Sequence, residues 1–151
     1  MASWHGGRPI EILLIEDNPG DIRLTLEALK ESRIYNRVSV VEDGNQARRY
    51  LHQSPRSESA PMPDLVLLDL NLPGIDGREI LEDMKASPEL CEIPVIALTA
   101  SNADQDILRA YELQARAYLN KPVNGEDLLK IIESIEGFWI TIIRRDADGN
   151  D

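Results

Sequence analysis

Short apolar runs alternate with longer amphipathic stretches along this chain, and the two kinds of segment predict different elements. Continuous apolar runs bounded by turn-forming residues are typical of strands that are buried on both faces of a parallel sheet. We therefore predict strands at residues 10–15, 38–41, 65–68, 93–98 and 117–119.

The stretches between these runs carry apolar residues at intervals of three or four positions, which predicts helices. The first helix is expected to begin at Asn18-Pro19, because proline is pre-organised for the first helical turn. A third helix is expected over 78–86, and the last helix is expected to start near Glu126. The residues expected to face the core are Ile22, Leu26 and Leu29, then Ala47, Tyr50 and Leu51, then Ile80, Leu81 and Met84, then Ile107, Leu108 and Tyr111, and finally Leu128, Ile131, Ile132 and Ile135.

Five strands that alternate with five helices predict an α/β fold built on a doubly wound five-stranded parallel sheet. Right-handed crossovers place the helices on both faces of such a sheet. The 151 residues suit one domain, which we assign to 10–136. Residues 1–9 are then an N-terminal extension, and 137–151 are a tail that partly extends the last helix or its packing. The Ser- and Pro-rich segment 52–63 is predicted to be a surface loop.

The composition excludes several classes of protein. No apolar run approaches the ~20 residues that a membrane span needs, and the first eight residues lack a signal-peptide pattern. The single cysteine, Cys91, excludes an internal disulfide and a cysteine zinc site. A net charge of −11 with a pI near 4.6 argues against a nucleic-acid surface. We expect a cytoplasmic protein that contacts neither membrane nor nucleic acid.

Acidic, hydroxyl or basic residues follow four of the predicted strands. Glu16 and Asp17 follow the first strand, Asp69 follows the third, Thr99 follows the fourth and Lys121 follows the fifth. The carboxyl ends of parallel strands lie at one edge of a sheet. With strand order 2-1-3-4-5, the first and third strands are neighbours, so Glu16, Asp17 and Asp69 should converge at the topological switch point. Taken alone, Asp69 is better explained as a turn residue at the end of a strand, but perturbed charge clusters in clefts are usually functional sites.

Converging carboxylates repel, by ~4 kcal/mol for two charges ~4 Å apart at an effective dielectric near 20. Either a carboxyl group is protonated or a cation is present. Oxygen ligands without Cys or His select a hard ion, and a few carboxylates plus water favour Mg²⁺ over Ca²⁺.

The complete set predicts a phosphoryl-transfer site. Asp69 is expected to attack phosphorus, and Mg²⁺ and Lys121 to neutralise the phosphoryl oxygens. The Thr99 hydroxyl can donate a hydrogen bond to one of these oxygens. The chain has no Gly-rich phosphate loop, so no nucleotide site is indicated.

These motifs resemble those of the response-regulator receiver domains, which have a flavodoxin-like fold. The resemblance implies that Asp69 accepts a phosphoryl group from a sensor histidine kinase, and that the protein is not an enzyme beyond self-catalysed phosphotransfer and slow autodephosphorylation. The matching segments are Glu16-Asp17-Asn18, Asp69-Leu70-Asn71-Leu72-Pro73-Gly74, Thr99-Ala100, and Tyr118 with Lys121-Pro122.

The resemblance also implies a set of metal ligands. Asp17 and Asp69 are expected to bind Mg²⁺ directly together with the backbone carbonyl of Asn71. Glu16 is expected to act largely through water.

A switch and a phosphate contact are implied in the same way. Thr99 and Tyr118 are expected to form the switch pair, and Lys121 to contact the phosphoryl group. The Lys121–Pro122 peptide bond is expected to be cis. Asn71 and Ser101 are expected to modulate autodephosphorylation.

Three further segments resemble the single-domain regulators that are paired with bacterial and cyanobacterial phytochromes: Asn18 to Leu24, the long loop before Pro63, and Ser134 to Trp139. A phytochrome-type kinase is the partner that this resemblance implies. The stretch after Lys121 is too short for an output domain, so the expected output is a contact with a downstream protein or the relay of phosphate.

The tail carries more apolar residues than one amphipathic helix needs. Such surplus marks interfaces, and we expect a homodimer with aromatic anchors. Alternatively, Trp139 folds back under the N-terminal segment. The residues of the expected dimer or partner surface are Phe138, Trp139, Ile142 and Ile143.

Two other functions use similar features. A Mg²⁺-dependent phosphatase of the haloacid dehalogenase type also uses Asp, Thr and Lys, but it carries its nucleophile on the first strand with a second Asp two residues later. Here Asp69 lies on the third predicted strand, and position 71 is Asn. An adaptor that keeps the fold without phosphorylation would not need the full acidic set.

Overall fold

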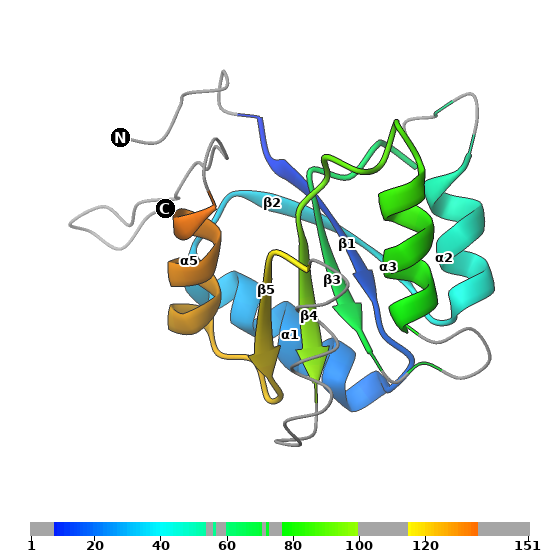
Figure 1. Ribbon diagram of the computed structural model, residues 1–151. Coiled ribbons are helices and arrows are strands. Elements are labelled where there is room, and N and C mark those ends of the chain that lie inside the picture. The colour runs from blue at the N-terminus through cyan, green and yellow to red at the C-terminus, as the bar shows by residue number, and fades with distance from the viewer. Residues whose placement is uncertain are drawn as a thin grey trace.

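The computed structural model describes residues 8–53, 56, 60–70, 72, 77–99 and 115–135. Its centre is one sheet of five parallel strands in the order β2-β1-β3-β4-β5, as predicted (Figure 1). The strands are β1 (Ile10–Ile15), β2 (Asn36–Val41), β3 (Leu65–Asp69), β4 (Val95–Thr99) and β5 (Ala117–Asn120).

Helices cover both faces of this sheet (Figure 1). The described helices are α1 (Pro19–Ser32), α2 (Gly44–Leu51), α3 (Gly77–Ala86) and α5 (Gly125–Ser134). Helices α1 and α5 pack on one face, and α2 and α3 pack on the other. The helix expected around Ile107, Leu108 and Tyr111 lies outside the described residues.

Strands β1, β3 and β4 are buried along their whole length. Successive side chains of a strand point to opposite faces, so β1 supplies both cores. Ile12 and Leu14 pack in the cluster under α1 and α5, whereas Leu13 and Ile15 pack in the cluster under α2 and α3. This two-sided burial explains why the three strands are almost entirely apolar, apart from Glu11 in β1 and the last residues of β3 and β4, Asp69 and Thr99.

Helix α1 begins where the sequence predicts, since the Asn18 side chain accepts a hydrogen bond from the backbone N–H of Asp21 at 3.0 Å and Pro19 is the first helical residue. Its predicted core stripe is wrong at Leu26, which is 38% exposed. Leu29 is buried as predicted, and Ile22 is half-buried against the same core. Thr25, Ala28 and Ser32 are also buried, although the predicted stripe did not include them.

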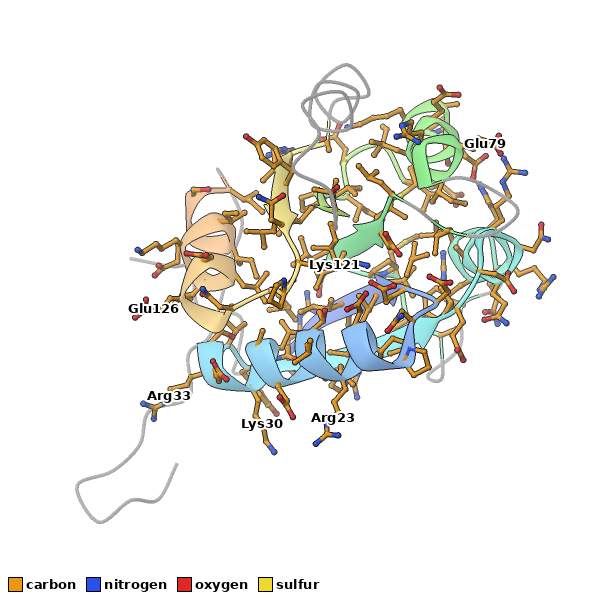
Figure 2. The ribbon with its side chains drawn as sticks, turned by 90° about the horizontal axis from the view of Figure 1, so that it is seen from below. Arg23, Lys30, Arg33, Glu79, Lys121 and Glu126 are labelled. Atoms are coloured by element: carbon orange, nitrogen blue, oxygen red, sulfur yellow. The ribbon has the colours of Figure 1, made fainter. Side chains whose placement is uncertain are left out.

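The reason is the close packing of α1 against α5. A Cβ atom on Gly125 would lie 2.8 Å from the carbonyl oxygen of Ala28 and 3.0 Å from the backbone nitrogen of Ser32. Only small side chains fit at such a contact, so the inward face of α1 is centred on small residues, and Leu26 is displaced to the side. The basic residues of α1 point away from the protein (Figure 2).

The other helices largely follow their predicted stripes. Ile80, Leu81 and Met84 of α3 are buried, and so are Leu128 and Ile132 of α5, with Ile131 packed more loosely against the same core. In α2, Ala47 and Leu51 are buried and Tyr50 is half-buried.

Several strand boundaries differ from the prediction. Strand β2 begins two residues earlier, at Asn36, and β4 begins two residues later, at Val95, whereas β3, β4 and β5 each end one residue later, at Asp69, Thr99 and Asn120. Pro94 has no N–H to donate, and it takes part only through its carbonyl, which accepts from Val66 at 3.0 Å. At the other end of the strand, Thr99 is the last residue of β4 and not the first residue after it. Within the described ranges, no helix has the length and apolar character that crossing a membrane requires.

Candidate functional site

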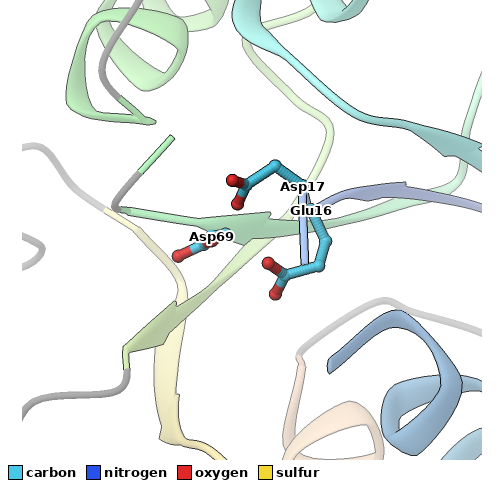
Figure 3. A group of neighbouring side chains, drawn as sticks. All are labelled: Glu16, Asp17 and Asp69. Carbon is cyan, nitrogen blue, oxygen red and sulfur yellow. The ribbon is translucent and has the colours of Figure 1, made fainter. Parts of the chain in front are cut away.

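Three carboxylates meet at the carboxyl edge of the sheet (Figure 3). Glu16 and Asp17 follow β1, Asp69 ends β3, and the two strands pair side by side with Ile15 opposite Leu68. One carboxylate oxygen from each residue lies within 4.8 Å of the others. The predicted convergence of these side chains is confirmed.

Glu16 is the most deeply placed of the three, with no exposed surface. Its Oε1 lies 2.7 Å from Nζ of Lys121, and its Oε2 accepts a 3.3 Å hydrogen bond from the backbone N–H of Asn18. Burial, together with the neighbouring carboxylate of Asp69, raises the pKa of Glu16 to about 7 against the lowering effect of Lys121. Glu16 is therefore close to half-protonated at neutral pH while no cation is bound.

Lys121 reaches this edge from the end of β5. Its backbone N–H donates to the carbonyl of Thr99 at 2.8 Å, and the Lys121–Pro122 peptide bond is cis, as the resemblance implies. The side chain, labelled in Figure 2, is only 9% exposed. Its Nζ atom lies 2.7 Å from Glu16, 3.0 Å from Asp21 and 3.3 Å from Asp69.

The ammonium group of Lys121 keeps its proton despite its surroundings. Burial lowers the pKa of Lys121, but hydrogen bonds to Glu16 and Asp21 and the charge of Asp69 outweigh burial and hold the pKa above its ordinary value. Lys121 is thus a fixed positive charge beside Asp69.

Asp69 is buried between these groups and is 3% exposed. Helix α3 begins directly against it, since a Cβ atom on Gly77 would overlap the Asp69 carbonyl oxygen and lie 2.7 Å from Cα of Leu70. Glycine at position 77 is therefore what permits this approach of α3 to the end of β3.

Thr99 and Tyr118 lie on β4 and β5, which pair side by side. Thr99 is 1% exposed and ends β4. Tyr118 is half-buried on β5 opposite Ala97, and it packs against Leu70 and Ala97. The other predicted site residues, Asn71, Ser101, Phe138, Trp139, Ile142 and Ile143, lie outside the described residues.

Asp21 is a site residue that the sequence analysis did not single out. It lies in the first turn of α1, and its Oδ2 accepts from Lys121. An acidic residue in the first turn of a helix is common for reasons of the helix dipole alone. In the sequence Asp21 is marked only as part of the segment Asn18 to Leu24, which carries the resemblance to phytochrome-paired regulators.

The charges and donor types at this edge suit a hard divalent cation. Among the described residues, Glu16, Asp21 and Asp69 share the ammonium group of Lys121, and Asp17 adds a fourth carboxylate beside Glu16 and Asp69, so acidic groups outnumber basic ones in this largely buried place. The available ligands are carboxylate oxygens, which Mg²⁺ and Mn²⁺ prefer over softer donors. Glu16, Asp17 and Asp69 are the residues that could hold the ion.

Comparison with known proteins agrees with this geometry. Residues 12–133 match the response regulator receiver domain. The chain belongs to this family, whose members act in two-component signalling and are signalling proteins rather than classical enzymes.

Full-length response regulators are among its relatives. Response regulator Rcp1 of Synechocystis sp. is 44% identical over 135 residues, which are 89% of this chain and 92% of Rcp1. The solved Mn²⁺-bound form of Rcp1 has a TM-score of 0.69 at 43% identity, over 90% of this chain and all of that one (100%).

Two further structures are similar. The bacteriophytochrome response regulator RtBRR has a TM-score of 0.78 at 37% identity, over 93% of this chain and 86% of that one. The phosphorylated cyanobacterial phytochrome response regulator RcpA has a TM-score of 0.69 at 44% identity, over 87% and 94% of the two chains.

Proposed function

We propose that Asp69 accepts a phosphoryl group from the phosphohistidine of a sensor histidine kinase, and that the kinase is of the phytochrome type. The observation that carries this proposal is the position of Asp69, which is buried beside two further carboxylates and 3.3 Å from the ammonium group of Lys121. An aspartate in this position can act as a nucleophile, and the positive charge of Lys121 can balance the negative charge of the aspartyl phosphate that forms.

In the transfer, a carboxylate oxygen of Asp69 attacks phosphorus. An O–P bond forms, the P–N bond to the kinase histidine breaks, and its electron pair stays on the departing imidazole. Lys121 supports the negative charge on the phosphoryl oxygens, and the Thr99 hydroxyl donates a hydrogen bond to one of them.

The cation that this site would hold is Mg²⁺. Asp17, Asp69 and the backbone carbonyl of Asn71 would be its ligands, and Glu16 would act largely through water. When bound, Mg²⁺ supplies positive charge to the phosphoryl oxygens. The supporting observation from this chain is the excess of carboxylates over lysine at the site, which a divalent cation would balance.

The phosphorylated state is transmitted by Thr99 and Tyr118 to a surface that binds a downstream protein or a second copy of this chain. Phe138, Trp139, Ile142 and Ile143 of the tail form that homodimer or partner surface. Slow autodephosphorylation, modulated by Asn71 and Ser101, ends the signal. The protein works in the cytoplasm and needs neither nucleic acid nor membrane.

The choice of a phytochrome kinase is supported by the relatives, since RtBRR is a bacteriophytochrome response regulator and RcpA a cyanobacterial phytochrome response regulator. Phosphotransfer from a panel of purified kinases tests this choice. A phytochrome kinase should label the protein fastest, and faster labelling by a kinase without a chromophore domain would contradict it.

The acceptor is tested with an Asp69→Asn variant and a radiolabelled phosphorylated kinase. Labelling should be lost, because the amide cannot form the acyl phosphate. The matched control is Asp83→Asn on α3, a partly exposed carboxylate whose Oδ2 lies 2.7 Å from His52; it should be labelled like wild type. Labelling retained by Asp69→Asn would assign the acceptor to another residue.

A further inference from the structure

Asp21 contacts the functional lysine but belongs to a different element from the other acidic residues. It occupies the first turn of α1, where its backbone N–H donates to the capping side chain of Asn18 at 3.0 Å. The cap holds the backbone of this turn in place. The Asp21 carboxylate then reaches sideways and lies 3.0 Å from Nζ of Lys121 across a separation of 100 residues.

The three acidic partners of Lys121 differ in what else they can bind. Glu16 and Asp69 both belong to the group of three whose oxygens lie within 4.8 Å of one another, together with Asp17. Asp21 is not a member of that group. A cation that engages Glu16 and Asp69 weakens their hold on the ammonium group, whereas Asp21 keeps its oxygens available to it.

Solvent exposure also distinguishes Asp21 from the other two acidic partners of Lys121. The side chains of Glu16 and Asp69 are 0% and 4% exposed, whereas that of Asp21 is 31% exposed. Asp21 is therefore the partner of Lys121 that solvent reaches most. An ammonium group has three N–H donors, so one donor can stay on Asp21 while another turns toward Asp69.

We infer that Asp21 is a positioning residue for Lys121, and that it holds the ammonium group beside Asp69 while the other carboxylates engage the cation and the phosphoryl group. This inference rests on the proposed function, since it assigns Asp21 a part in the phosphorylation of Asp69. Asp21 acts through Lys121 and contacts neither the phosphoryl group nor the ion.

The test is the rate at which Asp69 is phosphorylated by acetyl phosphate and Mg²⁺ in the Asp21→Asn variant. The rate should fall about tenfold, as expected for the loss of one charge-assisted hydrogen bond. Mg²⁺ affinity, measured by calorimetry, should stay within about twofold, because Asp21 is outside the group of possible ligands. An unchanged phosphorylation rate would overturn the inference.

A matched control is available on α5. Asp127 occupies the equivalent position of a helix that is also capped by asparagine, with its N–H donating to Asn124 at 2.8 Å. Asp127→Asn removes the same charge from the same place in a helix and should leave the rate unchanged. The conservative variant Asp21→Glu should recover most of the rate, and a failure to do so would contradict a role that depends on the carboxylate.

Coupling to Lys121 distinguishes positioning from a general effect on the fold. Asp21→Asn should change the rate by less than about twofold when it is added to Lys121→Gln, since the two residues act as one unit. The same tenfold loss in both backgrounds would refute the inference.

A second measurement does not depend on phosphorylation. The ion-paired ammonium protons of Lys121 should exchange slowly with water and give a distinct ¹H–¹⁵N signal, which Asp21→Asn broadens and Asp127→Asn does not. An identical signal in Asp21→Asn would overturn the inference. If wild type itself takes up no phosphate, the proposed function fails and the inference with it; if wild type is labelled and Asp21→Asn is labelled equally fast, only the inference fails.

Discussion

A buried glutamate lies at each end of β1, Glu11 within the strand and Glu16 directly after it, and the two ends differ in how their charges are balanced. At the amino end, Glu11 is 9% exposed and accepts three hydrogen bonds of 2.8 to 3.1 Å from the guanidinium group of Arg37. Nearby Asp64 accepts from the backbone N–H of Glu11 and lies 3.7 Å from Arg8. Two acidic residues there face two basic ones.

At the carboxyl end, Glu16 shares a single lysine with Asp21 and Asp69, and Asp17 adds a further acid. The first arrangement satisfies its charges within the protein, so it is a structural ion pair. In the second, acidic groups outnumber basic ones among the described residues, which a bound cation would balance. Burial of a carboxylate is thus common to both ends, and the excess of charge is what distinguishes a site from a stabilising contact.

The largest expected difference between the two ends is in phosphorylation. Lys121→Gln should lower the rate of Asp69 phosphorylation about 10²- to 10³-fold, since it removes a preorganised positive charge from the phosphoryl group. Arg37→Gln, which removes the base at the other end, should leave the rate within about twofold because Arg37 pairs with Glu11 away from Asp69. The rate of phosphorylation by acetyl phosphate measures the effect of each variant. Equal losses of rate in Lys121→Gln and Arg37→Gln would contradict a functional difference between the two ends of the sheet.

The next difference is in the pH dependence of stability. The pKa of Glu16 is raised to about 7 from 4.5, so the folded protein binds more protons than the unfolded chain between these values. Without divalent cations, the free energy of unfolding should therefore fall as the pH rises from about 4.5 to 7, by on the order of 3 kcal/mol.

Urea unfolding in the presence of a chelator measures this dependence. Glu16→Gln should lose this part of the slope, and Glu11→Gln should retain it. A Glu16→Gln variant with the wild-type slope would show that another group carries the dependence.

The response to Mg²⁺ is expected to be slightly smaller. Mg²⁺ at about 100 times its Kd should raise the free energy of unfolding by about 2.7 kcal/mol, since it binds only the folded site. Thermal unfolding with and without Mg²⁺ measures the shift. Asp17→Asn should abolish most of this shift, whereas Glu11→Gln should leave it unchanged. Loss of the Mg²⁺ shift in Glu11→Gln would place the ion at the amino end of the sheet and contradict the prediction.

The smallest effect is the loss of the ion pair at the amino end. Glu11→Gln should lower the free energy of unfolding by about 1 kcal/mol, because the Arg37 side chain is 66% exposed and water screens the pair. Denaturant unfolding at neutral pH measures it. A loss of several kcal/mol would mean that the amino end also carries uncompensated charge once one partner is removed.

Sequence patterns were sufficient for the order of the elements and for the convergence of Glu16, Asp17 and Asp69. Both follow from local rules, since continuous apolar runs become buried strands and the ends of parallel strands share one edge. The start of α1 at Asn18-Pro19 was equally local, because a cap needs only its own first turn.

Leu26 and Asp21 show where such rules fail. Spacing placed Leu26 in the core, but the close approach of Gly125 to Ala28 requires the small face of α1 there. Asp21 resembled an ordinary first-turn acid, and only the position of Lys121 gives it a partner. Both depend on contacts between residues about 100 positions apart.

By itself, then, the sequence determined the alternating parallel fold, the edge at which the acidic residues gather and the presence of one lysine among them. The tertiary structure decided which carboxylates share that lysine, how deeply each is buried and therefore that Glu16 has a pKa near neutrality. The physical reason is that strand and helix formation depend on neighbours along the chain. Ion pairing and desolvation depend on distances of a few ångströms between elements, which only packing sets.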